Sequence, residues 1–217
     1  METNNNFFEN NLPKEKTEEY PSIQEGNYLA CLGKVHVESR RNGVQVVYID
    51  HILIQRKDLE STPADKPYIY TDYDSEKKSL SLRRRLDGTP LIAGIMYNPS
   101  FPLTFDSMSN KFKGFQTYRK RSIAKNFGAL NEESGIVDWN IVAKYAGQIV
   151  SFQIFKNTYQ KDGQTKTNMD WSVESYSLIP GSKVPLEQVQ LIYLTIDDAK
   201  DSPKSSEPTV PDKDLPF

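Results

Sequence analysis

The sequence predicts a mainly β protein: a five-stranded barrel with a helix between its third and fourth strands. Apolar and polar residues alternate over several stretches, as they do in strands with one buried face. Asn-Gly and Asp-Gly pairs, which readily adopt tight hairpin turns, separate some of these stretches. The 217 residues are 37% hydrophobic, which suffices for the core of one domain of ordinary size.

The first two strands are predicted at 27–39 and 44–55, with Asn42-Gly43 in the turn between them. The second stretch is apolar on both faces, which is typical of a central strand. A long polar excursion, 56–78, then leads to a third strand at 79–86, where leucines alternate with polar residues.

The stretch 89–109 contains three prolines and predicts a loop or an ill-defined helix. Apolar residues then recur near helical spacing over 113–127, which predicts a helix. Strands four and five are expected at 147–159 and 165–178, joined by a turn at Asp162-Gly163.

Strand, strand, strand, helix, strand, strand is the order of an OB-type barrel, whose nucleic-acid face is flanked by two hairpin loops. We therefore expect one such domain at 23–196, between a flexible acidic arm at 1–22 and a disordered acidic tail at 197–217. The apolar segment 186–196 fits a strand or a helix. Packing on the barrel and self-association both remain open for it.

The net charge of −2 is unevenly distributed along the chain. Residues 1–20 hold five acids and two bases, and residues 197–217 hold six acids and three bases. The body, 21–196, keeps 22 bases against 18 acids. A basic body between acidic ends suits a polyanionic partner.

The composition argues against several other classes of protein. The sequence has no Gly-rich phosphate loop, no Cys/His spacing typical of a metal site and no Ser-His-Asp order. We therefore expect no enzyme, no metal and no cofactor. No apolar run reaches the roughly 18 residues of a membrane-spanning helix. The single cysteine, Cys31, lies in an apolar alternation and is expected in the core, in a reducing, cytoplasmic setting.

The segment 111–125 mixes six basic residues with aromatic rings, and no acid occurs between Asp106 and Glu132. Single-stranded DNA calls for this mixture, because cations follow its phosphates while aromatic faces stack on its bases. The same pattern also fits an amphipathic helix with a solvated basic face and aromatic residues in the core. At this segment alone, the residues leave both interpretations open.

Strand alternation and charge add candidates on the third strand and on both hairpins. The predicted DNA-binding residues are Arg40, Arg41, Arg83, Arg85, Lys111, Phe112, Lys113, Tyr118, Arg119, Lys120, Phe155, Lys156, Tyr159 and Lys161.

The chain ends in acids followed by Leu215-Pro216-Phe217. A terminal phenyl ring and a free carboxylate can dock together into a basic-rimmed apolar pocket of a partner. This end resembles the acidic C-terminal tip of bacterial and phage single-stranded DNA-binding proteins, which ends in Ile/Leu-Pro-Phe or a similar aromatic residue. It departs from the bacterial form in Lys213 and in having Leu where Ile is usual, and the body looks more like the divergent phage proteins.

The resemblance implies sequence-independent coating of single-stranded DNA in replication, recombination and repair, in the host cytoplasm if a phage encodes the chain. It also implies recruitment of a helicase, primase, polymerase or nuclease. The residues that would contact such a partner are Asp212, Asp214, Leu215, Pro216 and Phe217.

Two other functions remain open at this point. The chain could be a recombination mediator that anneals complementary strands, or a phage structural or adaptor β-protein whose tail only keeps it soluble. A metal-dependent nuclease would require several of the scattered acids, such as Asp50 and Asp170, to converge in the fold.

Overall fold

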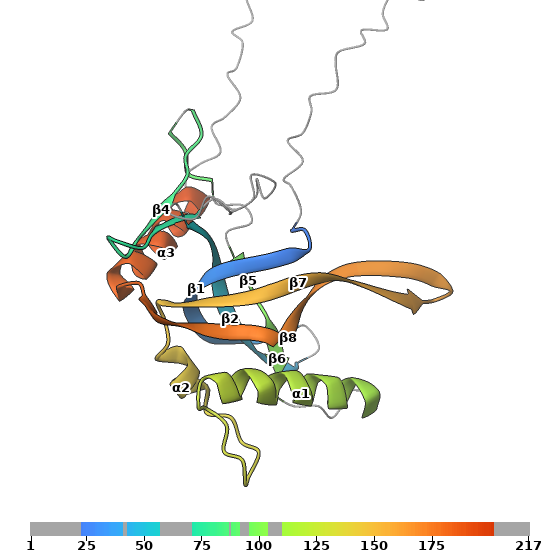
Figure 1. The fold of residues 1–217 in the computed structure, drawn as a ribbon. Coiled ribbons are helices and arrows are strands. Elements are labelled where there is room, and N and C mark those ends of the chain that lie inside the picture. Colours follow the sequence, from blue (N-terminus) through green and yellow to red (C-terminus); the bar gives the residue numbers. More distant parts are fainter. Residues whose placement is uncertain are drawn as a thin grey trace, which may run out of the picture.

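The computed structural model describes residues 23–40, 43–56, 71–86, 88–91, 96–103 and 110–201. The predicted acidic arm at 1–22 and the tip at 212–217 lie outside these residues, as does Arg41 of the predicted interface. The described part is mainly β, as the sequence predicts (Figure 1).

One sheet contains the described strands, in the order β4-β3-β2-β1-β7-β8, with β5 and β6 also paired to β2. The strands are β1 (Gly26–Ser39), β2 (Gln45–Arg56), β3 (Thr71–Asp74), β4 (Ser79–Leu82), β5 (Met96–Tyr97), β6 (Ser100–Pro102), β7 (Gln148–Lys161) and β8 (Gln164–Lys183). The helices are α1 (Asn110–Asn126), α2 (Trp139–Ala143) and α3 (Leu186–Asp201).

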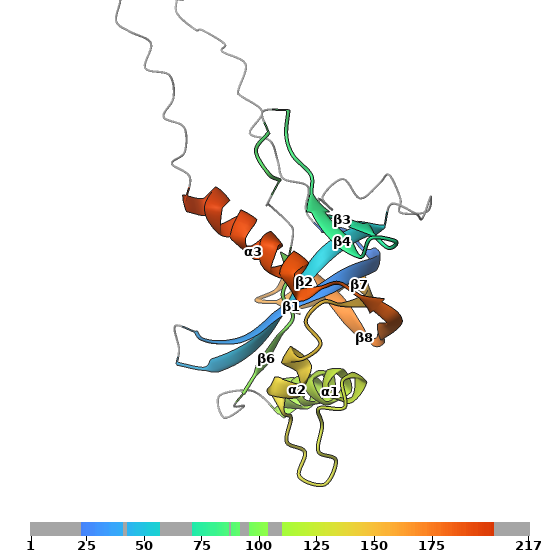
Figure 2. The same ribbon diagram turned by 90° about the vertical axis from the view of Figure 1, so that its left-hand side faces the viewer.

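Two long antiparallel hairpins extend from the body in different directions (Figures 1 and 2). We call residues 35–47 the β1–β2 arm and residues 155–168 the β7–β8 arm. Strands β1 and β7 pair only where β1 runs from Gly26 to Cys31, so the two arms separate beyond that contact. Asp162 and Gly163 both adopt positive φ, 55° and 74°, which confirms the predicted tight turn.

The sheet is open, and the predicted closed barrel is wrong. Within the described residues, no ladder of hydrogen bonds joins β8 back to β6. The prediction of a third barrel strand at 79–86 is also wrong. Only the first half of this segment, β4, is a strand, and it pairs with β3 rather than with β2. Strand β4 is an edge strand of four residues, and α3 packs against it.

Strands β5 and β6 pair antiparallel with β2 between Val46 and Ile52. Both lie inside the stretch 89–109, which was predicted as a loop or ill-defined helix. They are two and three residues long and are separated by Asn98-Pro99. Proline lacks the amide that a ladder needs, which both shortens these strands and hides them in the sequence.

Helix α1 confirms the helix predicted at 113–127, and it begins slightly earlier, at Asn110. Helix α3 settles the ambiguous segment 186–196 as a helix packed on the sheet, and it continues to Asp201, into the predicted tail. The short helix α2 was not predicted. Asp138 caps it by accepting a hydrogen bond from the Asn140 amide at 3.0 Å.

Two apolar clusters lie on opposite faces of the sheet, since alternate residues of a strand point to opposite sides. The inner cluster includes Val150 of β7 and is covered by α1 and α2 through Phe127 and Val142. The outer cluster includes the next-door Ile149 and is covered by α3 through Ile192. Helices α1 and α3 therefore lie on opposite sides of the sheet (Figure 2).

Candidate nucleic-acid interface

The β7–β8 arm is a two-stranded ribbon that extends beyond the apolar clusters. Its two strands pair in continuous register from Phe155 with Asp170 to Lys161 with Gln164. Polar cross-strand contacts support it, including the Gln160 amide donating to Thr165 Oγ1 at 2.7 Å. Since almost every side chain of the arm is exposed, packing does not explain which residues occupy it.

One face of this arm combines aromatic rings with cations. Phe155, Tyr159 and Lys161 share that face because they are separated by even numbers of residues, and Lys166 lies opposite Tyr159 on the paired strand. The Phe155 and Tyr159 side chains are 37% and 43% exposed. Four residues of strand separate the two rings by about 13 Å, so they can stack on different bases of one strand.

The lysines of the arm are available to bind an anion. Among the ion pairs between described residues, none involves Lys156, Lys161 or Lys166. Lys161 and Lys166 belong to the aromatic face, and Lys156 belongs to the opposite one. Of these three, Lys166 is outside the predicted DNA-binding set, although its position near the hairpin turn was a visible signal.

The β1–β2 arm contributes one described cation of the predicted set. The exposed Arg40 lies at the end of this arm and donates to Ser100 Oγ at 3.1 Å. The hairpin closes there through backbone hydrogen bonds from Arg40 to Val44 and from Gly43 to Arg40. Its neighbour Arg41 is outside the described residues.

Arg119 of α1, predicted to contact DNA, is instead part of the interior. Its side chain is 9% exposed, and it donates to Asp170 Oδ1 at 2.8 Å and to the Trp171 carbonyl at 3.2 Å. The guanidinium also lies 4.4 Å from the centre of the Trp171 ring. This cation fastens α1 to β8, and its charge is already satisfied within the protein.

The other predicted residues of α1 have mixed surroundings. Tyr118 is exposed, but its hydroxyl donates to Glu174 Oε1 at 2.8 Å, and Lys113 is half-buried. Lys120 is half-buried too, and this burial lowers the pKa of its ammonium group. For Lys111 and Phe112 the structure describes only their place in the helix.

Arg83 and Arg85 lie at the other end of the sheet from β8, because they follow β4. Arg83 donates to Asp72 Oδ1 at 2.9 Å and to the side-chain oxygen of Gln55. The predicted convergence of this strand with both hairpins on one groove is therefore absent from the described residues. The predicted set divides between the two arms, α1 and the β4 edge.

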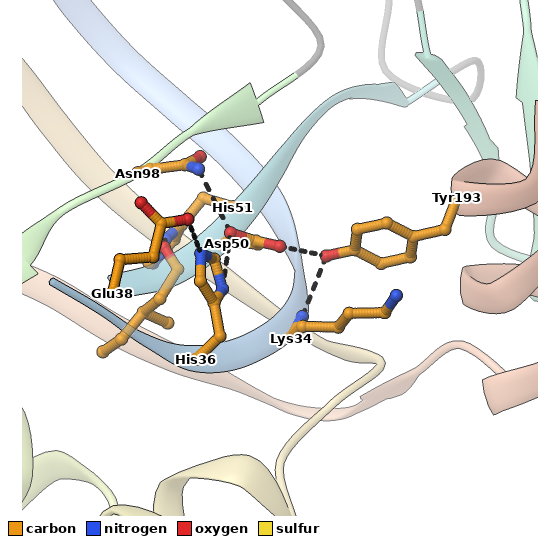
Figure 3. A network of polar contacts seen from close by, with 8 residues as sticks. Lys34, His36, Glu38, Asp50, His51, Asn98 and Tyr193 are labelled. Atoms are coloured by element: carbon orange, nitrogen blue, oxygen red, sulfur yellow. Dashed lines mark hydrogen bonds and ion pairs between the residues drawn. The ribbon is translucent and has the colours of Figure 1, made fainter. Parts of the chain in front are cut away.

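A polar network that sequence reasoning missed joins β1, β2 and α3 (Figure 3). The buried carboxylate of Asp50 accepts hydrogen bonds from the Tyr193 hydroxyl at 2.5 Å and from the Asn98 amide at 3.1 Å. The Tyr193 oxygen in turn accepts from the Lys34 backbone amide at 2.9 Å. This arrangement satisfies a buried charge and fastens α3 to the sheet, which is a structural role.

His36 lies between two carboxylates of this network. Its Nδ1 is 3.6 Å from Asp50 Oδ1, and its Nε2 is 3.1 Å from Glu38 Oε1. Its ring stacks on Tyr48 with centroids 5.5 Å apart. Within the described residues, no three His, Cys, Asp or Glu side chains are grouped so that they could hold a metal ion.

His51 is fully buried in the inner cluster, between Ile49 and Tyr176. Its Nδ1 lies 2.9 Å from the Ile49 carbonyl, so Nδ1 carries the proton, and Nε2 accepts from the Tyr176 hydroxyl at 2.8 Å. Burial lowers the pKa of His51 to about 4. Cys31 is buried as predicted, and burial raises the pKa of its thiol to about 12.

No protein-family model matches this chain, and no match to it was found among the curated proteins. Among the helices of the described residues, none is long and apolar enough to cross a membrane.

Proposed function

We propose that this chain binds single-stranded DNA without regard to sequence and without catalysis, through the aromatic face of its β7–β8 arm. One observation carries the proposal: exposed Phe155 and Tyr159 share a face with Lys161 and Lys166, which have no ion-pair partner among the described residues. Rings stack on bases of any sequence, at about 1–3 kcal/mol per base, while lysines neutralise phosphates.

The arrangement of the elements also supports an OB-type ancestry, opened rather than closed. Strands β1, β2, β5 with β6, then α1, then β7 and β8 follow the strand and helix order of an OB barrel. In that comparison the two arms correspond to the two hairpin loops that flank the ligand. The short β3 and β4 are then an insertion at the edge of the sheet.

The proposed DNA path starts on the β7–β8 arm and continues toward Arg40 at the end of the β1–β2 arm. Arg83 and Arg119 are not part of it, since acids of the chain hold both. We further propose that the terminal Leu215-Pro216-Phe217 recruits replication proteins in the cytoplasm, as the resemblance of the tip implies.

The proposal is tested by fluorescence anisotropy with a labelled oligothymidine of about 12 nucleotides, within the range that one such domain covers. We expect tight binding that weakens steeply between 50 mM and 200 mM salt, as phosphate contacts require. Absence of binding by the folded wild-type chain would overturn the proposal.

A pair of variants then locates the contact. Phe155→Ala/Tyr159→Ala should weaken oligothymidine binding by about 100-fold, because two stacking platforms are lost. The matched control Phe115→Ala/Tyr118→Ala removes two exposed rings from α1 and should change the affinity less than about threefold. Equal losses from the two double variants would rule out the arm as the principal DNA contact.

A further inference from the structure

Helix α3 exposes an apolar strip that its packing on the sheet does not use. Leu191 and Leu194 are 52% and 60% exposed, whereas Val189, Ile192 and Ile196 face the outer cluster. Acids lie along the exposed side of the helix. Four acids against one lysine give α3 a net charge of −3; the acids are Glu187, Asp197, Asp198 and Asp201.

Helix α1 exposes an apolar strip of the opposite charge. Phe115 and Tyr118 are 46% and 51% exposed, and Lys125 lies on the same side because it is seven residues from Tyr118. The helix contains six bases and no acid. Asp170, Glu132 and Glu174 bind α1 from other elements, so its six bases and these three acids give a formal charge of +3 among the contacts of the described residues.

We propose that α3 of one copy of this chain docks on α1 of a second copy. Both strips present two exposed apolar side chains, and their excess charges, −3 and +3, are opposite. Charges of this kind act over roughly 8 Å at physiological salt, the distance across a helix pair. Pairing of α3 with another α3 is disfavoured because its acids would meet acids; in an antiparallel pair, for example, Glu187 would lie opposite Asp198.

The positions of the two helices determine what such a contact builds. They lie on opposite sides of the sheet (Figure 2), so a copy that uses its α3 keeps its α1 open for the next copy. A contact between two different surfaces repeats without closing unless the rotation happens to form a ring. The copies therefore form a head-to-tail row. Alignment of that row along one DNA strand rests on the proposed function; the protein contact itself does not.

Sedimentation of the full chain without DNA tests the contact, at protein concentrations up to about 1 mM. We expect the average mass to rise steadily with concentration and to pass the mass of a dimer. The α3 variant Leu191→Ser/Leu194→Ser and the α1 variant Phe115→Ser/Tyr118→Ser should each remain monomeric. The control Ile136→Ser, at a 67% exposed residue on neither helix, should assemble as the wild type does.

An equimolar mixture of the two monomeric variants separates this contact from a symmetric one. The α3 variant retains an intact α1, and the α1 variant retains an intact α3, so the mixture should form dimers and nothing larger. A wild-type chain that stays monomeric, a mass that stops at the dimer, or an α1 variant that still assembles would each overturn the proposal. Binding of the short oligothymidine reports on the proposed function separately.

Discussion

Helix α1 and the β7–β8 arm both place aromatic rings beside cations, but the fold treats their cations differently. In α1, Arg119 is buried against Asp170, and Arg121 and Lys125 both bind Glu132. In the arm, Lys161 and Lys166 have no ion-pair partner among the described residues. Three of the six cations of α1 are therefore already paired with acids, whereas Lys161 and Lys166 of the sparser arm are in no ion pair between described residues.

This difference teaches that the local density of basic residues does not measure the charge available to a ligand. Availability depends on which acids the fold brings to the same place. Asp170 is 51 residues from Arg119 in the chain, so no local pattern announces their pairing. The exposed β7–β8 arm keeps its lysines available because, among the described residues, the fold places no acid in an ion pair with them.

The largest expected effect concerns the buried side of this comparison. Arg119→Ala should lower the free energy of unfolding by about 3 kcal/mol or more, because it leaves the carboxylate of Asp170 without its partner in a largely buried site. Urea unfolding followed by tryptophan fluorescence measures this. The control Lys125→Ala removes a solvent-exposed partner of Glu132 and should leave stability nearly unchanged. Equal stability of the two variants would contradict the structural role of Arg119.

Low pH should reduce the stability of the core beneath α1 without changing the contribution of the β7–β8 arm to DNA binding. His51 lies in the inner cluster that α1 covers, and the pKa of this residue falls from 6.5 to about 4 on folding. Below pH 6.5 the His51 side chain therefore binds a proton in the unfolded chain, whereas in the folded chain it binds one only near pH 4. Stability contributed by neutral His51 is present above pH 6.5 and is lost as the pH falls to 4, by about 3 kcal/mol.

Urea unfolding at several pH values, compared with His51→Gln, isolates this effect because all other titrating groups are the same. Glutamine can also donate to the Ile49 carbonyl and accept from Tyr176, so the variant should fold with a weaker dependence on pH. The β7–β8 arm contains no histidine, so the loss of oligothymidine affinity caused by Phe155→Ala/Tyr159→Ala should be similar at pH 7.5 and pH 5.5. The same pH slope in both proteins would exclude His51 as its source.

The smallest effect concerns the free cations of the arm. Lys161→Ala/Lys166→Ala should reduce the slope of log affinity against log salt by about 1.4, since each single-strand phosphate contact contributes about 0.7. Oligothymidine titrations at three salt concentrations measure this slope. The comparison variant Arg121→Ala/Lys125→Ala should change it far less, because Glu132 already binds both cations. A larger change of the salt slope in Arg121→Ala/Lys125→Ala would show that the cations of α1, rather than those of the arm, contact the phosphates.

Local signals predicted a substantial part of the fold. Alternation over β1, β2, β7 and β8 located both hairpins, and Asp162-Gly163 located the turn of the second. Helical spacing located α1, since Ile123 and Phe127 had to share one buried face. These predictions succeeded because residues close in sequence carry the signal.

The failures have a common physical origin in distant contacts. Strands β5 and β6 are too short and too rich in proline to be recognised, and only the ladder along β2 makes them strands. The third strand was misplaced because the leucine alternation of β4 is real, but it says nothing about which strand lies beside it. Closure of the barrel likewise depends on whether β8 pairs with β6, and the local sequence of neither strand determines this pairing.

The sequence by itself determined the mainly β class, the two arms, helix α1 and the exposed aromatic and basic residues of the β7–β8 arm. Each of these depends on patterns within a few residues. Only the tertiary structure decided that Arg119 is buried, that Asp50 is held by Tyr193, and that α1 and α3 occupy opposite sides of the sheet. Burial and ion pairing depend on residues 50 to 150 positions away, and local patterns carry no information about them.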